Sequence, residues 1–349
     1  MGRKIVIVGA GAVGGYAGAH MVQAGEDVTF IDPWPEHVEA LKRDGVVLSG
    51  TQGDARIPIK ALHIHEVQGL SRQPVDIAFI SVKSYDTEWA TMLIRQYLAP
   101  GGFVVSLQNC INEERIAGVV GWGRTVGCIA STIGVSVDRP GHVVRTYKPG
   151  GASYTVFRVG EVHGRVTQRA EELVRMLSAV DSAELTTDLW GERWSKLTAN
   201  SMHNGLAGST GLGHTGVYGQ AAPRGIAIRL GGEAVKVGRA LGFSVESIRG
   251  IPADALEAAA YGDASARTTV ESVIAGWMTR MTDEGRPSMA HDILKGRRTE
   301  IEYINGTVVE KAAEVGIPVP TQVAMLELVR RVERGDLAPD IRNLAALPG

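Results

Sequence analysis

The sequence predicts an α/β fold in which a doubly wound parallel sheet forms the first half of the chain and an all-helical domain forms the second. Short apolar segments rich in β-branched residues alternate with helix-length segments up to about residue 180, as in parallel sheets with crossover helices. From about Asp188 the strand signals fade, and long segments rich in Ala and Leu run to the C-terminus.

The first predicted strand leads directly into a glycine-rich turn. Ile5 to Val8 form an apolar run suited to a strand that is buried on both faces. The glycines that follow have the spacing G-x-G-x-x-G, in which the first permits a tight turn, the second lets the backbone approach a pyrophosphate and the third allows close helix packing. Backbone N–H groups at the start of the next helix then face the anion. We therefore predict a Rossmann-type dinucleotide-binding turn made of Gly9, Ala10, Gly11, Ala12, Val13 and Gly14.

An acidic residue follows at the distance that such a site uses. A second strand, Val28 to Ile31, ends at Asp32, where a carboxylate would accept hydrogen bonds from the adenosine ribose and repel a 2′-phosphate. This favours NAD over NADP as the cofactor. The alternative is that Asp32-Pro33 merely starts a turn, because both residue types are common in turns.

The first half continues with further strands and a final helix. The strand-like segments are Asp76 to Val82, Phe103 to Leu107, Val126 to Ala130, His142 to Tyr147 and Tyr154 to Val159. The last two flank a Pro-Gly-Gly sequence, so we expect them to pair as an antiparallel edge. Thr167 to Val180 has an apolar helix face and is expected to be the last helix of a domain spanning residues 1–187.

The second domain, residues 188–349, is predicted to be built from helices alone. The helical segments are Glu192 to Leu206, Ala222 to Leu241, Ala253 to Ala260, Thr268 to Met281, Met289 to Val315 and Thr321 to Arg334. A cleft between the two domains is the default ligand site.

Composition restricts the class of protein. With 349 residues, 44% of them apolar, the chain can bury two ordinary cores, and a net charge of −2 argues against a nucleic-acid or membrane-surface protein. Cys110 and Cys128 are the two cysteines, so we expect no disulfide framework and a reducing, cytoplasmic location. The uncharged stretch Ile5 to Gly25 resembles a signal peptide, but its glycines and strand-turn-helix pattern favour a buried βα unit.

Two groups of polar residues in the second half are candidates for chemistry. Lys196, Asn200 and Asn204 step by four along a predicted helix and therefore share one face. They form either a solvated stripe or a cleft-facing amine with two amides that bind a substrate hydroxyl or carboxylate.

Ser288, Asp292 and Glu300 form the second group. Ser288 follows Pro287, so it also suits a helix N-cap with ordinary surface charges beyond it. Spacing alone does not establish that the two groups meet.

These residues together resemble the ketopantoate reductase (2-dehydropantoate 2-reductase) family over nearly the whole chain. The resemblance rests on the turn Gly9 to Gly14, Lys83 in SVKSYDT, Asn109 in SLQNC, and two longer patterns. These are W-x-K-x3-N-x3-N through Trp194, Lys196, Asn200 and Asn204, and S-x3-D-x7-E-x4-N through Ser288, Asp292, Glu300 and Asn305. The resemblance implies a Rossmann domain followed by a helical domain, a homodimer formed through the helical half, and NAD(P)H-dependent reduction of a small branched 2-keto acid to the 2-hydroxy acid.

The resemblance also implies roles for the matching residues. Lys196 matches the general acid, and Glu300 matches a residue near the cofactor and the lysine. Substrate ligands are matched by Asn200, Asn204 and Ser288, and cofactor-side residues by Lys83 and Asn109, of which Asn109 is also expected to contact the substrate. As a hydride reaches a carbonyl carbon, an ammonium group in hydrogen-bond reach stabilises and then protonates the oxygen.

Three positions depart from the family pattern. Asp32-Pro33 stands where NADP-dependent members commonly carry Arg, which again favours NAD and a dehydrogenase that runs in the oxidising direction. Cys110 replaces the glycine of Q-N-G, and His214 replaces a further asparagine, so the substrate is less well defined than the reaction type.

Other interpretations stay open. The chain is alternatively a divergent NAD-dependent dehydrogenase of another hydroxy acid, or a non-catalytic nucleotide sensor. His63 and His65 lack a third metal ligand nearby in sequence, so surface histidines are favoured and no metal is expected. His203 and His291 lie beside the two polar groups but off their helix faces.

Overall fold

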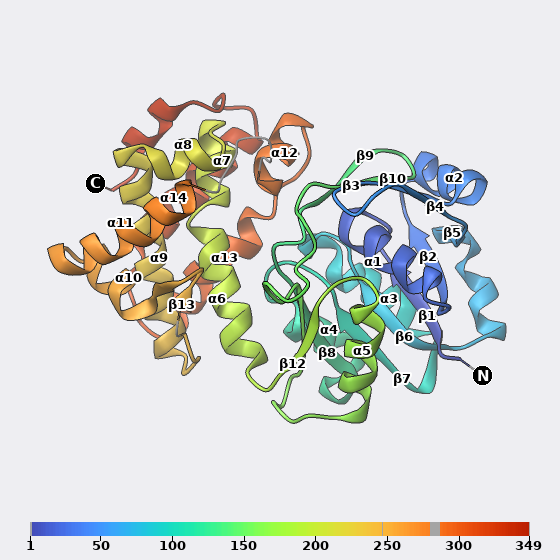
Figure 1. The fold of residues 1–349 in the computed structure, drawn as a ribbon. Coiled ribbons are helices and arrows are strands. Elements are labelled where there is room, and N and C mark those ends of the chain that lie inside the picture. The colour runs from blue at the N-terminus through green and yellow to red at the C-terminus, as the bar shows by residue number, and fades with distance from the viewer. Residues whose placement is uncertain (1, 246, 280–286, 349) are drawn as a thin grey trace. The chain divides into compact units, whose positions relative to one another are not determined.

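The computed structural model describes residues 2–245, 247–279 and 287–348. The chain divides into two compact units, Met1–Leu189 and Trp190–Gly349 (Figure 1). Among the described residues, no helix combines the length and the apolar character that a membrane crossing requires.

The first unit is built on an eight-stranded sheet in the order β12-β11-β8-β7-β6-β1-β2-β5. Its strands are β1 (Lys4–Val8), β2 (Asp27–Asp32), β5 (Lys60–His63), β6 (Val75–Ile80), β7 (Leu98–Ser106), β8 (Thr125–Ala130), β11 (Phe157–Glu161) and β12 (Ala183–Thr186). All neighbouring pairs are parallel except β8 and β11. The predicted α/β fold with a doubly wound, mainly parallel sheet is therefore confirmed.

Helices cover both faces of this sheet. They are α1 (Ala12–Gln23), α2 (Pro35–Asp44), α3 (Thr87–Arg95), α4 (Glu113–Val120) and α5 (Gln168–Ser178), with the 3-10 segments η1 (Ile64–Arg72), η2 (Ser84–Asp86) and η3 (Trp122–Arg124). Ile5 and Ile7 of β1 belong to one apolar core, and Val6 and Val8 belong to another. Alternate side chains of β1 thus enter opposite faces, which explains why this strand is apolar throughout.

A second, four-stranded sheet lies in the same unit and was not predicted. Its order is β4-β3-β10-β9, with bounds β3 (Val46–Gly50), β4 (Ala55–Ile57), β9 (Val135–Arg139) and β10 (His142–Arg145). The predicted antiparallel pairing of His142–Tyr147 with Tyr154–Val159 is wrong. β10 pairs with β3 and β9, whereas β11 pairs with β8 and β12 in the main sheet. The Pro-Gly-Gly segment forms no hairpin there, because the Gly150 N–H instead donates to the Asp181 carboxylate at 3.0 Å.

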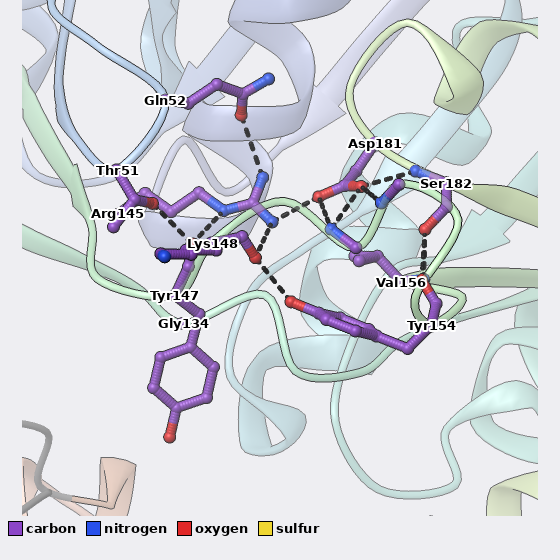
Figure 2. A network of polar contacts seen from close by, with 12 residues as sticks. Thr51, Gln52, Gly134, Arg145, Tyr147, Lys148, Tyr154, Val156, Asp181 and Ser182 are labelled. Carbon is purple, nitrogen blue, oxygen red and sulfur yellow. Dashed lines mark hydrogen bonds and ion pairs between the residues drawn. The ribbon is translucent and has the colours of Figure 1, made fainter. Parts of the chain in front are cut away.

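Arg145, the last residue of β10, links the four-stranded sheet to α1 and to the segment before β12 through a buried polar network (Figure 2). Its guanidinium forms an ion pair with Asp181, and both side chains are almost fully buried. It also donates to Gln52 Oε1 at 3.0 Å and to the Tyr16 hydroxyl of α1 at 3.2 Å. Burial opposes ionisation of Asp181, but the Arg145 hydrogen bond and the Ser182 N–H together lower the pKa of this carboxyl.

The second unit is helical, as predicted, apart from one short hairpin of β13 (Ser247–Ile248) and β14 (Ile251–Pro252). Its helices are α6 (Leu189–Ser201), α7 (Asn204–Thr210), α8 (His214–Gly219), α9 (Ala221–Ala240), α10 (Ala253–Ala260), α11 (Ala264–Met278), α12 (Ser288–Leu294), α13 (Ile301–Glu314) and α14 (Pro320–Glu333), followed by η4 (Ile341–Ala346). The predicted end of a helix at residues 280–281 lies outside the described residues.

Two predicted helices are wrong because each is interrupted. The segment Glu192–Leu206 is divided between α6 and α7, where His203 has the non-helical angles φ −127° and ψ −45°. The segment Met289–Val315 is divided between α12 and α13, where Gly296 has φ +61°, a conformation that ends a helix.

The core of the second unit includes a tight contact between α6 and α9. Trp194 is fully buried, and its Nε1 donates to the Ala234 carbonyl oxygen at 2.8 Å. A Cβ added at Gly238 would lie 2.1 Å from the same Nε1. The indole therefore occupies the space that any side chain at position 238 would need.

Candidate functional site

The glycine turn joins β1 to α1 and packs against the loop that follows β6. Gly9 has φ +100°, and a Cβ there would lie 2.7 Å from the Ser81 carbonyl carbon. A Cβ at Gly14 would lie 2.2 Å from the Gly9 carbonyl oxygen, which only glycine avoids. By contrast, no atom lies within 4 Å of the Cβ position of Gly11. The turn thus meets the three requirements of a dinucleotide site: a tight bend, close helix packing and an open approach to the backbone.

Asp32 ends β2 and binds this turn. Its Oδ2 accepts a hydrogen bond from the Ala10 N–H at 2.8 Å, and its Oδ1 accepts one from the Trp34 N–H at 2.9 Å. The hydrogen bond to Trp34 shows that Asp32 starts a turn, as the alternative interpretation of Asp32-Pro33 expects. Asp32 also holds Ala10 of the glycine turn. Burial raises the pKa of Asp32 above its ordinary value, although both N–H donors oppose this shift. Because Asp32 takes the Ala10 N–H, an anion at the turn would meet the N–H groups of the first turn of α1.

Lys83 and Asn109 lie in the loops after β6 and β7, which are adjacent parallel strands. Two buried amides join these loops. Gln108 Nε2 donates to the Val82 carbonyl oxygen at 2.9 Å, and Asn112 Nδ2 donates to Ser84 Oγ at 3.1 Å and to the Asn109 carbonyl oxygen at 2.8 Å. The expected cofactor-side residues are therefore held by hydrogen bonds that the sequence analysis missed. A polar residue directly after an apolar strand, as at Gln108, was the available signal.

The first-unit candidates gather at one edge of the sheet. The glycine turn, Asp32, Lys83 and Asn109 follow the carboxyl ends of β1, β2, β6 and β7, which are neighbours in the order β7-β6-β1-β2. The connection after β1 leads to β2 and the connection after β6 leads to β7 on the opposite side, and ligands of open α/β sheets bind at such a reversal.

Cys110 lies beside Asn109 in an uncommon backbone conformation. It is buried and has φ +64°, a left-handed value that favours glycine. The position thus keeps the backbone of a glycine although a side chain is present. Cys128 is also buried, in β8.

Lys196, Asn200 and Asn204 do not share one continuous helix, contrary to the prediction. Lys196 and Asn200 are half-buried on α6, whereas Asn204 is buried and begins α7. The His203 N–H donates to the Asn200 carbonyl oxygen at 3.2 Å, so the chain stays compact across the interruption. The three residues are close in the chain, but Asn204 does not continue the helix face of Lys196 and Asn200, because α6 ends before it.

The second polar group is likewise spread over two helices. Ser288 is exposed and is the first residue of α12, while Pro287 takes the N-cap position and offers no side-chain cap. Glu300 is buried at the N-cap of α13. α12 packs against α7, where a Cβ at Gly208 would lie 3.0 Å from Met289. The helix that carries Ser288 therefore borders the helix that carries Asn204.

Asn305 makes contacts that hold helices together. Asn305 is fully buried, and its Nδ2 donates to the Ser201 carbonyl oxygen at 3.3 Å and to Gln322 Oε1 at 2.8 Å. It thus fixes the end of α6 against α13 and α14.

His203 lies in a stack of three nearly parallel rings. Its ring centroid is 4.3 Å from that of His214 and 5.2 Å from that of Tyr218. Within the described part of the chain, neither ring nitrogen of His203 has a hydrogen-bond partner. Burial, with His214 and Arg249 nearby, holds the pKa of His203 well below its ordinary range, so this imidazole is neutral. By contrast, His291 is exposed.

The remaining histidine candidates, His63 and His65, lie together near the surface beside Glu39. His63 Nε2 contacts Glu39 Oε1 at 2.6 Å, and the His63 and His65 rings stack with centroids 5.2 Å apart. In the described residues, no group of three or more His, Cys, Asp and Glu side chains is arranged to hold a metal ion.

Two family models cover most of the chain. A model described as ketopantoate reductase PanE/ApbA matches residues 5–156, and one for the C-terminal part of the same family matches residues 188–333. A 2-dehydropantoate 2-reductase of Archaeoglobus fulgidus is 30% identical over 334 residues, which are 95% of this chain and 99% of that protein. A protein of the same name from Pyrococcus horikoshii is 28% identical over 95% of this chain and 97% of its own length.

Solved structures share the fold over nearly the full length. A PanE/ApbA family ketopantoate reductase from Ralstonia eutropha JMP134 is 26% identical, with a TM-score of 0.76 over 95% of this chain and 99% of that one. D-mandelate dehydrogenase in complex with NADH and anilino(oxo)acetate is 22% identical, with a TM-score of 0.79 over 95% of this chain and 99% of its own, and shows likeness of fold alone. The chain belongs to the ketopantoate reductase family, whose members are oxidoreductases that act on CH–OH groups.

Proposed function

We propose that this protein transfers a hydride between a nicotinamide dinucleotide and C2 of a branched 2-keto or 2-hydroxy acid, in the manner of ketopantoate reductase. The observation that carries the proposal is the glycine turn, which leaves the approach to Gly11 open and whose Ala10 is held by Asp32. The family match over both halves of the chain supports the reaction type.

Lys196 is the proposed general acid, with Glu300 as its catalytic partner. Reduced nicotinamide, when bound, supplies the hydride that reaches C2. The Lys196 ammonium stabilises the negative charge that grows on the carbonyl oxygen and donates a proton to it. In the reverse direction the neutral amine takes that proton from the hydroxyl group.

Amide and hydroxyl groups orient the substrate in this proposal. Asn200, Asn204 and Ser288 donate to the carboxylate and side-chain hydroxyl of the acid, and Asn109 contributes from the cofactor side together with Lys83. Such donors raise the rate by fixing the reacting geometry and exclude acids that lack the matching groups.

NAD is the proposed cofactor, with NADP as the second possibility. Asp32 ends β2 and carries a carboxylate where a 2′-phosphate would need a cation. Repulsion by that carboxylate favours a free ribose hydroxyl.

We assign the dinucleotide to residues 1–187 and the substrate to residues 188–349. The helical half also supplies the proposed homodimer contact, and the proposed location is the cytoplasm. No nucleic-acid or membrane partner is proposed.

A second candidate is an NAD-dependent dehydrogenase of another hydroxy acid. His214 and His203 form a stacked pair directly beside Asn204, and a pair of rings differs in shape and chemistry from a lone amide. A structural neighbour is named D-mandelate dehydrogenase, so the same fold serves other hydroxy acids.

The test follows reduced-nicotinamide absorbance with purified protein, ketopantoate, and NADH or NADPH in parallel. Rapid consumption of NADH supports both the reaction and the cofactor, whereas consumption of NADPH alone overturns the choice of NAD. If neither is consumed, a panel of 2- and 3-hydroxy acids with NAD decides between the second candidate and a nucleotide sensor without turnover.

A further inference from the structure

His37 of α2 contacts the glycine turn and is almost completely buried. Its Nδ1 accepts a hydrogen bond from the Gly141 N–H at 3.0 Å, and its Nε2 lies 2.8 Å from the Ala10 carbonyl oxygen. A ring nitrogen that accepts an N–H bond carries no proton, so Nε2 carries it and donates to Ala10. The neighbours on both sides thus select one neutral tautomer.

Both backbone groups of Ala10 are therefore bound by residues of the β2–α2 segment. The Ala10 N–H donates to Asp32, and the Ala10 carbonyl oxygen accepts from His37. Ala10 stands between Gly9 and Gly11, two of the three glycines of the turn, which have the greatest backbone freedom. These two hydrogen bonds fix the peptide groups on both sides of Ala10, next to the Gly9 N–H, which donates to the Ile31 carbonyl oxygen at 2.8 Å.

The ring of His37 is itself held in place from two sides. The Trp34 ring stacks on it, with centroids 5.3 Å apart and planes 7° from parallel. On the other side, Gly141 in the turn between β9 and β10 has φ +75°, and a Cβ there would lie 3.0 Å from Ala40. The small sheet can thus approach α2 closely enough for the Gly141 N–H to reach the imidazole.

We propose that His37 is a positioning residue for the dinucleotide turn. By donating to the Ala10 carbonyl oxygen, it keeps the turn in its binding conformation and so sets the affinity for the dinucleotide. Gly141 acts one step further away, because its N–H keeps the His37 proton on Nε2. The inference rests on the dinucleotide part of the proposed function.

Three substitutions separate the contributions of His37. His37→Phe keeps a ring against Trp34 but removes both hydrogen bonds. His37→Gln places an amide N–H at about the reach of Nε2, whereas His37→Asn places an amide oxygen at about the reach of Nδ1. The control is His65→Phe, which changes an exposed histidine of the same unit.

The measurement is a fluorescence titration with NADH, or with NADPH if the wild-type protein binds only that, together with steady-state kinetics and thermal unfolding. We expect the Kd of the dinucleotide to rise about tenfold in the Phe and Asn variants, and to stay within about twofold of wild type in the Gln variant and the control. The kcat at saturating cofactor and the KM for the keto acid should stay near wild type. A merely structural role for His37 would change these constants or the unfolding temperature without sparing the Gln variant.

Two outcomes overturn the inference. If the Phe and Asn variants bind the dinucleotide as tightly as wild type, or if the Gln variant loses as much affinity as the Phe variant, His37 does not position the turn. If the Phe variant fails to fold, the comparison of the Gln and Asn variants decides. If the wild-type protein binds neither dinucleotide, the proposed function itself fails. If the wild-type protein binds a dinucleotide and the His37 variants bind it equally well, only the inference about His37 fails.

Discussion

The carboxylate of Asp32 and the backbone N–H of Ala10 are joined by a 2.8 Å hydrogen bond. The residue expected to select the ribose therefore also supports the turn expected to bind the pyrophosphate. A change at Asp32 should alter both the choice of cofactor and the strength with which any dinucleotide binds.

Replacing Asp32-Pro33 by Ala-Arg should therefore have two effects. The ratio of kcat/KM for NADPH to that for NADH should rise at least about tenfold, because a repelling carboxylate is replaced by a phosphate-binding guanidinium. The kcat/KM for NADH should fall, because Ala10 loses its acceptor. Pro33→Arg alone keeps Asp32 and serves as the control, with a smaller change in the ratio. An unchanged ratio in the double variant would show that another element reads the ribose.

Lys196→Ala should lower kcat by about two to four orders of magnitude, because the general acid and a positive charge are lost together. The Kd for the dinucleotide should not change, since the first unit holds the proposed binding turn. Lys236→Ala is the matched control, because Lys236 lies in the same unit, with Nζ 4.6 Å from the centre of the Tyr261 ring. Single-turnover rates measure the effect, and a nearly wild-type rate for Lys196→Ala would remove the proposed mechanism.

Asp181→Asn should destabilise the first unit by about 3 kcal/mol or more, because Arg145 is left as a buried charge without its counter-ion. Glu172→Ala removes the more exposed pair with Arg3 and should change the free energy of unfolding by no more than about 1 kcal/mol. Urea unfolding measures both changes. Equal effects in the two variants would contradict the importance of burial at Asp181.

The same carboxyl should contribute a dependence on pH. The folded structure lowers the pKa of Asp181 below its ordinary value of 3.8, so the unfolded chain takes up a proton first. The stabilisation is complete above that value and is lost as the pH falls through the folded pKa. The urea midpoint of wild type should therefore fall more steeply below pH 3.8 than that of Asp181→Asn.

Gly238→Ala should destabilise the second unit by about 2 kcal/mol or more, because the new methyl group overlaps the Trp194 indole. Gly276→Ala is the matched control in α11, where no atom lies within 4 Å of the Cβ position. That substitution should raise stability by up to about 1 kcal/mol, since alanine loses less backbone entropy on folding. A similar melting temperature for the two variants would refute the assigned contact.

The parts of the fold that could be predicted are those set by local sequence. The β1 strand and the turn after it were recognisable because two-faced burial requires an apolar run and the bend requires glycine at Gly9 and Gly14. The small sheet was not, since β3 and β10 are short and pair across a long chain separation, as His142 does with Val47. Pairing at such separation depends on the whole domain and leaves little trace in a short window.

In the candidate site, too, features set by local sequence could be predicted and features set by distant contacts could not. The interruption between α6 and α7 contains Met202 and His203, neither of them a helix breaker, so the spacing of polar residues continued across it. His37 could not be identified from its neighbours in sequence, because its chemistry depends on Gly141, which the turn between β9 and β10 brings to it. Motif residues with a local backbone requirement were visible, whereas their supporting hydrogen bonds were not.

The buried ring stack in the second unit gives that unit its own sensitivity to acid. The fold keeps the His203 imidazole neutral, so this ring gains a proton only when the chain unfolds. At pH values below the ordinary histidine pKa of 6.5, protonation therefore favours the unfolded state. In the first unit His20, whose pKa burial also lowers, acts in the same direction, and the loss at Asp181 follows below 3.8. Mild acidification should thus destabilise each half through a histidine that the fold keeps neutral, and the sheet half should lose further stability through Asp181 only in stronger acid.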